Sequence, residues 1–257
     1  MIFPISDDDR HLMSPAWITI LLLAANVVVF AMQLLDPGLT YGWSVIPKEI
    51  VTGVDLTDPV LIKVGQQVGQ IPQLPGPVPI YLTIFSAMFM HGGWAHIGGN
   101  MLYLWIFGDN VEHRFGSLKF LLFYLISGIV ATFAQIATNP DSVIPNLGAS
   151  GAISGVLGAY MVLFPRNMVN AIFFFRIVSL PAIFVIGMWI FLQLVNGAGS
   201  IAPTAETGGG VAYAAHIGGF VAGVAMGFFA RMGMKNHEPP SVFRRIYEDE
   251  PKVRRYW

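Results

Sequence analysis

Four polar residues that lie in otherwise apolar stretches could carry chemistry: His96, Asn100, Ser150 and His216. A serine hydroxyl becomes a strong nucleophile when an adjacent base takes its proton, and histidine is the commonest such base. The attacked carbonyl then becomes an oxyanion, which needs hydrogen-bond donors. His96 and Asn100 are four residues apart and share a helix face, so they could be those donors. The backbone N–H of Ser150, near a helix N-terminus, could add another. The pattern favours acyl transfer with Ser150 as nucleophile and His216 as base.

The composition of the chain indicates a membrane protein. Of its 257 residues 54% are hydrophobic and only 11% are charged, and the mean hydropathy is +0.62, which is unusual for a soluble domain. The net charge of −1 argues against a nucleic-acid partner, because binding phosphates needs a basic patch. The absence of cysteine excludes disulfides, thiol catalysis and thiolate metal sites. The acidic N-terminal segment lacks the basic region of a secretory signal, so we expect the first apolar segment to be retained.

Six apolar stretches predict the helices that would position these residues. A helix needs about 20 apolar residues to cross about 30 Å of hydrocarbon, which four stretches meet and two approach. The stretches are 17–35, 94–107, 120–137, 150–164, 178–195 and 212–230. The long connection 36–81 is rich in proline, so we expect an interfacial loop with short helical pieces. The sequence therefore predicts an all-α polytopic membrane protein with six transmembrane helices and a long first outer loop.

The basic residues predict how the chain is oriented. Lys and Arg accumulate in short cytoplasmic loops, and with the N-terminus inside, all but Lys48 and Lys63 of the 14 basic residues lie inside. We therefore expect both termini to be cytoplasmic. The predicted parts are a cytoplasmic segment at 1–14, a transmembrane domain at 15–231 and a cytoplasmic tail at 232–257. The aromatic run 173–175, beside Arg176, predicts an anchor at the membrane interface.

With this orientation the four polar residues lie at the same depth. The second, fourth and sixth spans run from outside to inside, and all four residues stand near the starts of these spans. The fourth span, at about 22 Å, is too short for a full crossing. Irregular backbone at membrane depth needs burial in protein or a water-filled cavity. We therefore expect the segment before Ser150 to descend into a polar recess, and hydrolysis requires such water.

Small residues predict that the fourth and sixth spans approach closely. Gly151, Gly155 and Gly158 follow Ser150, while Gly219, Gly223 and Gly227 follow His216 at four-residue spacing. Such spacing permits close helix packing. Because Gly223 and Gly227 lie within about 20° of His216 around the helix, the face that approaches its neighbour also presents the imidazole. Ser150 and His216 are expected to meet.

Three motifs resemble those of the rhomboid intramembrane proteases. They are HGGWAHIGGNMLYLWIFGDNVEHRFG, GASG and AHIGGFVAG, in the same order and on the second, fourth and sixth spans, and the likeness covers 81–230. The resemblance implies that Ser150 is the nucleophile, His216 the general base, and His96 and Asn100 the oxyanion donors. It also implies structural roles for Glu112 and Arg114 in the turn after the second span.

The resemblance further implies transmembrane protein substrates, cleaved in or next to a membrane-spanning segment, within a lipid bilayer. It implies no metal and no cofactor, and the orientation suits a prokaryotic plasma membrane. Two features depart from the family: Ser154 stands where some members have an aromatic residue beneath the catalytic histidine, and the first loop lacks a Trp-Arg pair.

Other functions fit the sequence less well. An inactive relative that binds membrane-protein clients is the main alternative, but it should have lost Ser150 or His216. A transporter should show inverted repeats, and none is visible. A metal site built from His91, His96 and His216 would lack an acidic ligand within the spans. Gly108-Asp109 is similar to part of an aspartyl intramembrane protease site, but no second intramembrane aspartate exists.

Overall fold

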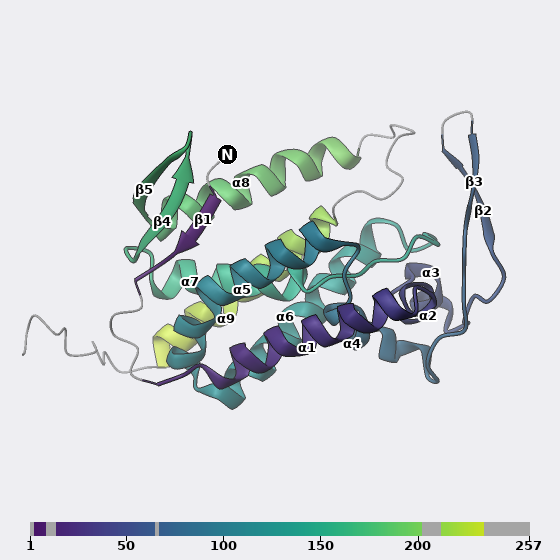
Figure 1. The fold of residues 1–257 in the computed structure, drawn as a ribbon, viewed down its shortest axis with the longest axis horizontal. Coiled ribbons are helices and arrows are strands. Elements are labelled where there is room, and N and C mark those ends of the chain that lie inside the picture. The colour runs from purple at the N-terminus through teal and green to yellow at the C-terminus, as the bar shows by residue number, and fades with distance from the viewer. Residues whose placement is uncertain (1–2, 9–13, 65–66, 202–211, 234–257) are drawn as a thin grey trace, which may run out of the picture.

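The computed structural model describes residues 3–8, 14–64, 67–201 and 212–233 and is mostly helical (Figure 1). Each apolar stretch predicted from the sequence overlaps one of the longer helices. These are α1 (Trp17–Leu35), α5 (Trp94–Phe115), α6 (Ser117–Thr138), α7 (Ser150–Leu163), α8 (Ala182–Ile201) and α9 (Tyr213–Gly233). The tail expected at 232–257 lies almost wholly outside the described residues.

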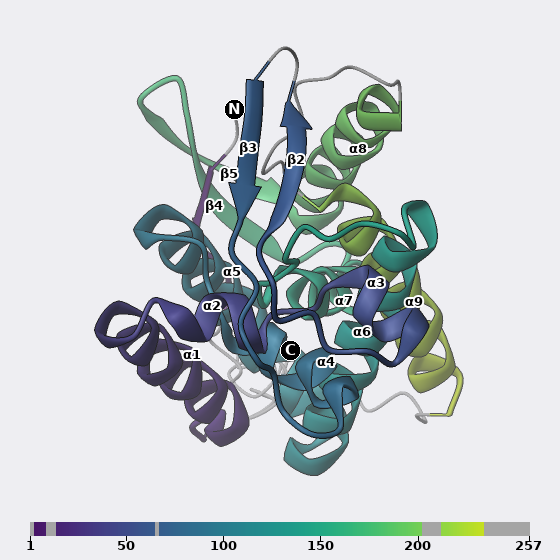
Figure 2. The same ribbon diagram turned by 90° about the vertical axis from the view of Figure 1, so that its right-hand side faces the viewer.

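Helix α7 forms the centre of the bundle. Every residue from Gly151 to Tyr160 is buried, and α5, α6 and α9 pack around it (Figure 2). At 14 residues it is about 21 Å long, shorter than the hydrocarbon core of a bilayer. The first residue of α7, Ser150, is half-buried.

The outer helices have the composition and the exposed surface of membrane-spanning segments. Helices α1, α6 and α9 are long and apolar enough to cross a membrane, while 150–163 and 182–198 are shorter apolar helices. Large apolar side chains such as Leu35, Leu122, Phe184 and Phe229 are exposed on the outer helices. Apolar surface of this extent suits contact with lipid. The chain is an integral membrane protein.

The expectation of an all-α fold is confirmed in part: the structure is mostly helical, but it also contains two small antiparallel sheets. Strand β1 (Phe3–Ser6) pairs with β4 (Met168–Phe173), which pairs with β5 (Arg176–Pro181). Strands β2 (Val60–Val64) and β3 (Gln67–Ile71) form a separate hairpin. The predicted fifth span therefore begins too early, since 178–181 belongs to β5. Pro181 explains the boundary, because the residue before a proline is driven toward extended backbone.

The long first connection contains short helices, as expected, in addition to the hairpin of β2 and β3. The described pieces are α2 (Gly38–Trp43), α3 (Pro47–Thr52) and the start of η1 (Ile80–Leu82); α4 (Thr83–Ser86) and η2 (Ala87–Phe89) follow between this connection and α5. Val45 pairs with Asn146 through two backbone hydrogen bonds of 3.0 and 2.7 Å, and Gly148 N–H donates to the Ala87 carbonyl at 2.8 Å. These bonds attach the connection to the segment that leads into α7.

Glu112, near the C-terminal end of α5, connects this helix to the N-terminal end of α1. This contact agrees with the structural role implied by the resemblance. Its carboxylate accepts hydrogen bonds from the backbone N–H groups of Ile18 (3.0 Å) and Thr19 (2.7 Å), and from the hydroxyls of Thr19 and Ser117. The first N–H groups of a helix lack partners within the helix, and its dipole favours a negative charge there. Glu112 therefore caps α1 from the neighbouring helix.

Candidate active site

Ser150 and His216 form a hydrogen-bonded pair. His216 Nε2 lies 2.8 Å from Ser150 Oγ, although the residues are 66 positions apart. Ser150 begins α7 and His216 lies in the first turn of α9, so both stand at the same end of the bundle. His216 is buried and Ser150 is half-buried. The distance is short enough for direct transfer of the hydroxyl proton.

Glycine contacts between α7 and α9 produce this approach. A Cβ atom on Gly219 would overlap the carbonyl oxygen of Gly151, and one on Gly223 would overlap that of Gly155. One turn further along α9, a Cβ on Gly227 would lie 2.9 Å from the Cα of Ala159. The glycine face predicted from the sequence is therefore the face along which the helices pack, and it carries His216.

The segment before Ser150 leads into the interior of the helix bundle, and its backbone forms hydrogen bonds with neighbouring segments. Gly148 has φ of +133°, a conformation that side-chain-bearing residues rarely adopt. Its N–H donates to the Ala87 carbonyl, and Ala149 is fully buried. The irregular backbone expected at this depth is thus accommodated by hydrogen bonds to η2 and the long connection.

His96 and Ser150 both lie close to Gly148. The point where a Cβ atom of Gly148 would stand is 2.9 Å from His96 Nε2 and 3.5 Å from Ser150 Oγ. His96 Nδ1 lies 3.2 Å from the backbone N–H of Gly92 and accepts from it, so the neutral ring carries its proton on Nε2. His96 therefore has its Nε2–H donor on the same side of Gly148 as the Ser150 hydroxyl.

Asn100 follows His96 by one turn of α5 and is buried. Its Nδ2 atom has no hydrogen-bond partner within the described part of the chain. Most buried polar groups are paired, because an unpaired donor costs free energy. The Asn100 amide, one turn after His96 on α5, is therefore available to donate a hydrogen bond to a bound ligand.

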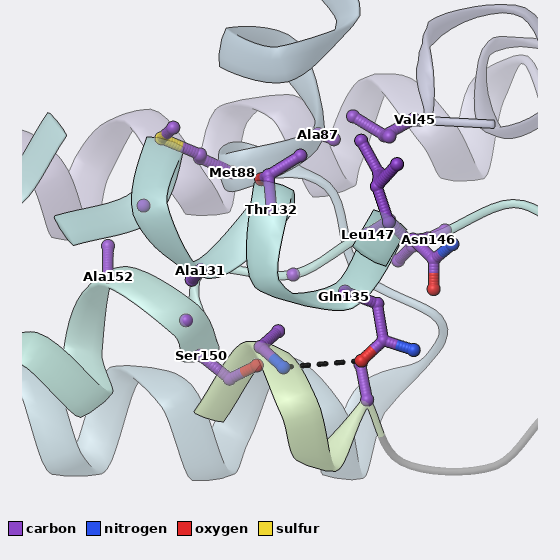
Figure 3. A pocket seen from close by; sticks show the side chains of 16 residues that line it. Val45, Ala87, Met88, Ala131, Thr132, Gln135, Asn146, Leu147, Ser150 and Ala152 are labelled. Atoms are coloured by element: carbon purple, nitrogen blue, oxygen red, sulfur yellow. Dashed lines mark hydrogen bonds between the residues drawn. The ribbon is translucent and has the colours of Figure 1, made fainter. Parts of the chain in front are cut away.

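A cavity adjoins Ser150 on the side of α6 (Figure 3). Its volume is about 40 Å³, and Thr132, Gln135, Asn146 and Ser150 contribute polar groups to a lining that is otherwise mainly apolar. Gln135 Oε1 also accepts a hydrogen bond of 3.2 Å from the backbone N–H of Ala215, drawn as the dashed line in Figure 3. A cavity of this size with several polar groups in its lining can hold about two or three water molecules.

Two residues of α8, Gln193 and Trp189, contact His216, and neither was a candidate site residue from the sequence. Gln193 Oε1 lies 2.8 Å from His216 Nδ1. The Trp189 ring lies one turn earlier, with its centroid 5.8 Å from that of the imidazole. Ser154 does not contact the imidazole through a hydrogen bond; its hydroxyl donates to the Ser150 carbonyl at 2.6 Å. A polar residue inside an otherwise apolar span was the available signal for Gln193.

Comparison with known proteins identifies the family. A model of the rhomboid domain matches residues 80–233. The chain is 33% identical over 152 residues to the mitochondrial Rhomboid protein 1 of Saccharomyces cerevisiae, covering 58% of this chain and 41% of that protein. It is 35% identical over 150 residues to Rhomboid protease GluP of Bacillus subtilis, covering 56% of this chain and 26% of that protein.

A third relative is matched over more of its length: RHOMBOID-like protein 5 of Arabidopsis thaliana is 27% identical over 227 residues, covering 83% of this chain and 67% of that protein. The match to the first two relatives spans less than half of their length. The family model covers more than half of this chain and includes His96, Asn100, Ser150 and His216. This chain belongs to the rhomboid family.

Proposed function

We propose that this protein is an intramembrane serine endopeptidase that cleaves membrane-anchored proteins in or next to a transmembrane segment. The observation that carries the proposal is the 2.8 Å hydrogen bond between His216 Nε2 and Ser150 Oγ. The His96 Nε2–H donor lies nearby, on the same side of Gly148 as Ser150 Oγ. Family membership supports the same reaction, since the matched relatives include a protein named a rhomboid protease.

The first half of the reaction acylates Ser150. His216 Nε2 takes the hydroxyl proton while Oγ attacks the peptide carbonyl, forming a tetrahedral intermediate with a negatively charged oxygen. His96 Nε2–H, Asn100 Nδ2–H and the backbone N–H of Ser150 are the donors proposed for that oxygen. The protonated His216 then gives its proton to the leaving amine, the C–N bond breaks, and an acyl ester remains on Ser150.

The second half releases the acyl group with water. A water molecule beside Ser150 loses a proton to His216 and attacks the ester carbonyl, and the proton returns to Ser150 Oγ as the ester bond breaks. The cavity lined by Thr132 and Gln135 supports this step, because it offers several polar groups, has room for water and adjoins Ser150.

The membrane arrangement is part of the proposal. Six spans, with both termini in the cytoplasm, would place the Ser150 end of α7 in the outer half of the bilayer, within reach of the transmembrane segments of other proteins. This orientation follows from the distribution of Lys and Arg and suits a prokaryotic plasma membrane.

Cleavage of a model single-span substrate by the purified protein in liposomes tests the proposal. We expect product from the native chain and none above background from Ser150→Ala or His216→Ala. Ser154→Ala is the matched control. It removes a hydroxyl group from the same helix, and this hydroxyl bonds only the Ser150 carbonyl, so the variant should retain most activity. Binding of substrates without cleavage by the native chain would instead favour an inactive, client-binding relative.

A further inference from the structure

Gln193 of α8 forms a hydrogen bond with Nδ1, the second ring nitrogen of His216. Its Oε1 lies 2.8 Å from His216 Nδ1, while Nε2 of the same ring lies 2.8 Å from Ser150 Oγ. To accept the serine proton, Nε2 must be unprotonated, so a neutral ring must carry its proton on Nδ1. An amide oxygen only accepts hydrogen bonds. Gln193 Oε1 therefore favours the one tautomer that can act as a base.

The contacts of α8 take the place of an aromatic support from α7. Ser154, one turn after Ser150, bonds the Ser150 carbonyl and has no ring to stack on the imidazole. Trp189 lies one turn before Gln193 on α8, with its ring centroid 5.8 Å from that of His216. The residues that surround the imidazole are thus an acceptor and an aromatic ring from the same helix face.

We propose that Gln193 is a positioning residue that sets the tautomer and orientation of His216. This inference rests on the proposed protease activity and adds a third member to its Ser-His pair. Because Gln193 is neutral, it orients the imidazole without supplying a negative charge. It acts only through His216, so its loss should lower kcat and leave KM largely unchanged.

The test compares cleavage kinetics of Gln193→Met and Gln193→Glu with the native chain. Methionine keeps the length of the side chain but loses the strong acceptor. We expect kcat to fall by about 10- to 100-fold, by analogy with the loss seen when the residue that orients a metal-bound histidine is removed. Glutamate keeps an acceptor and should recover most of that loss. Leu192→Met, at the adjacent exposed position of α8, should cleave like the native chain, and thermal unfolding checks that each variant is folded.

The outcomes separate this inference from the proposed function. If the native chain cleaves and Gln193→Met has an unchanged kcat, the positioning role is wrong while the protease assignment stands. The same conclusion follows if Gln193→Glu is no better than Gln193→Met. If the native chain itself cleaves nothing, the proposed function fails and Gln193 has no catalytic base to position.

A second inference concerns the hairpin of β4 and β5, and it is independent of catalysis. Its two-residue turn consists of Phe174 and Phe175, with φ of +44° and +63°. Such turns favour asparagine and glycine, because side-chain-bearing residues are strained at positive φ. Both phenylalanines are nevertheless exposed, at 76% and 101%. Phe174 makes a ring contact with the neighbouring Phe173, with centroids 4.6 Å apart, and the turn geometry does not favour two aromatic residues at this place.

The polarity of the hairpin changes along its length. Near the turn, Phe3 of β1, Ile172 and Ile177 are exposed apolar side chains that pair as neighbours across the three strands. Toward the base, Asn170 pairs with Ser179, and its side chain donates to Ser6 Oγ at 3.0 Å. Most of the exposed apolar side chains therefore lie in the distal half of the hairpin, although Met168 at its base is exposed as well.

The position of the hairpin fits contact with lipid. It joins the end of α7 to the start of α8, and it runs across the direction of the helices at the level of their ends (Figure 1). Aromatic residues with an adjacent arginine are favoured where hydrocarbon meets the headgroups. We infer that the Phe174-Phe175 turn inserts into the bilayer interface, on the membrane face opposite the Ser150–His216 pair.

Because the chain has no cysteine, single labelled positions can measure this insertion directly. An environment-sensitive fluorophore on Phe175→Cys, in vesicles of phosphatidylcholine and phosphatidylglycerol, should emit at shorter wavelength and be quenched by lipids that carry a quencher in the upper acyl chain. The same label on Asp58→Cys, an exposed position in the long connection, should show neither effect. Water-like emission without lipid quenching at position 175 would overturn the inference, as would shielding that appears only at high protein-to-lipid ratio and so reports a second copy.

Discussion

Gly223 of α9 lies directly against Gly155 of α7, so closely that a single added methyl group would overlap the Gly155 carbonyl oxygen. This contact lies about one and a half turns after Ser150 on α7 and about two turns after His216 on α9. The backbone separation of α7 and α9 therefore sets the distance between nucleophile and base, and glycine is the residue that permits that separation.

Replacing Gly223 should consequently damage both stability and activity. In Gly223→Ala the helices must move apart, which should lower the free energy of unfolding by about 1–3 kcal/mol, the usual cost of overpacking. Cleavage should fall further than the stability loss explains, because the serine and histidine separate. The control is Gly233→Ala at the end of the same helix, where no atom lies near the added Cβ; thermal unfolding and cleavage should both stay near native. Native kinetics in Gly223→Ala would contradict this role of the contact.

Gly148→Ala should abolish most activity for a different reason. The new methyl group would occupy the space between His96 and Ser150, 2.9 Å from His96 Nε2, where the carbonyl of the substrate is proposed to sit. It would also strain a backbone with φ of +133°. Gly116→Ala separates the two effects, because Gly116 has φ of +80° but open space around it. We expect both variants to lose stability in thermal unfolding, and only Gly148→Ala to lose kcat.

Asn100→Ala should lower kcat without lowering stability. Removing one oxyanion donor typically costs about 100- to 1,000-fold in kcat. Since Asn100 Nδ2 has no partner in the described residues, its removal deletes a buried unpaired donor rather than a hydrogen bond, and unfolding should occur at the same or a higher temperature. A clear fall in unfolding temperature with unchanged kcat would show that Asn100 is structural.

The raised pKa of Glu49 predicts that the stability of the fold depends on pH, separately from catalysis. It is a buried residue of α3 in the long first connection, and burial raises its pKa from 4.5 to about 7, with nearby Asp55 adding to the rise and the Leu56 N–H opposing it. Because the folded protein holds this proton more tightly than the unfolded chain, stability should fall as the pH rises from 4.5 to about 7.

Glu49→Gln should remove that dependence. The variant keeps an acceptor for the Leu56 N–H, so it should be more stable than the native chain above pH 7 and similar to it near pH 4.5. Thermal unfolding across this range gives the comparison, with Asp58→Asn, an exposed acid in the same connection, as the control that keeps the native profile. Parallel profiles for Glu49→Gln and the native chain would contradict the assignment.

The sequence predicted those parts of the fold that depend on hydropathy and on small residues. The first apolar stretch coincides with α1, and the glycines after Ser150 and His216 identified the faces of α7 and α9 that pack together. These features are local to each helix and have a simple period, so a single sequence reveals them.

Two features could not be predicted, for physical reasons. The hairpin of β4 and β5 has Phe174 and Phe175 at its turn, where the usual glycine or asparagine signal is missing. Gln193 lies in an apolar span, but hydropathy does not fix the rotation of a helix around its axis, so its contact with His216, 23 residues away, appears only when α8 is placed against α9.

The central claim is that Ser150 is a nucleophile activated by His216, and covalent trapping tests it without knowledge of the natural substrate. A fluorophosphonate reacts with an activated serine when Oγ attacks phosphorus and fluoride leaves. Incubation of the native protein in liposomes, followed by peptide mass spectrometry, should find the adduct on Ser150. His216→Ala should react far more slowly and Ser150→Ala not at all, while Ser154→Ala should label like the native chain. No adduct on Ser150 in the native protein, or equal labelling after His216→Ala, would contradict the account.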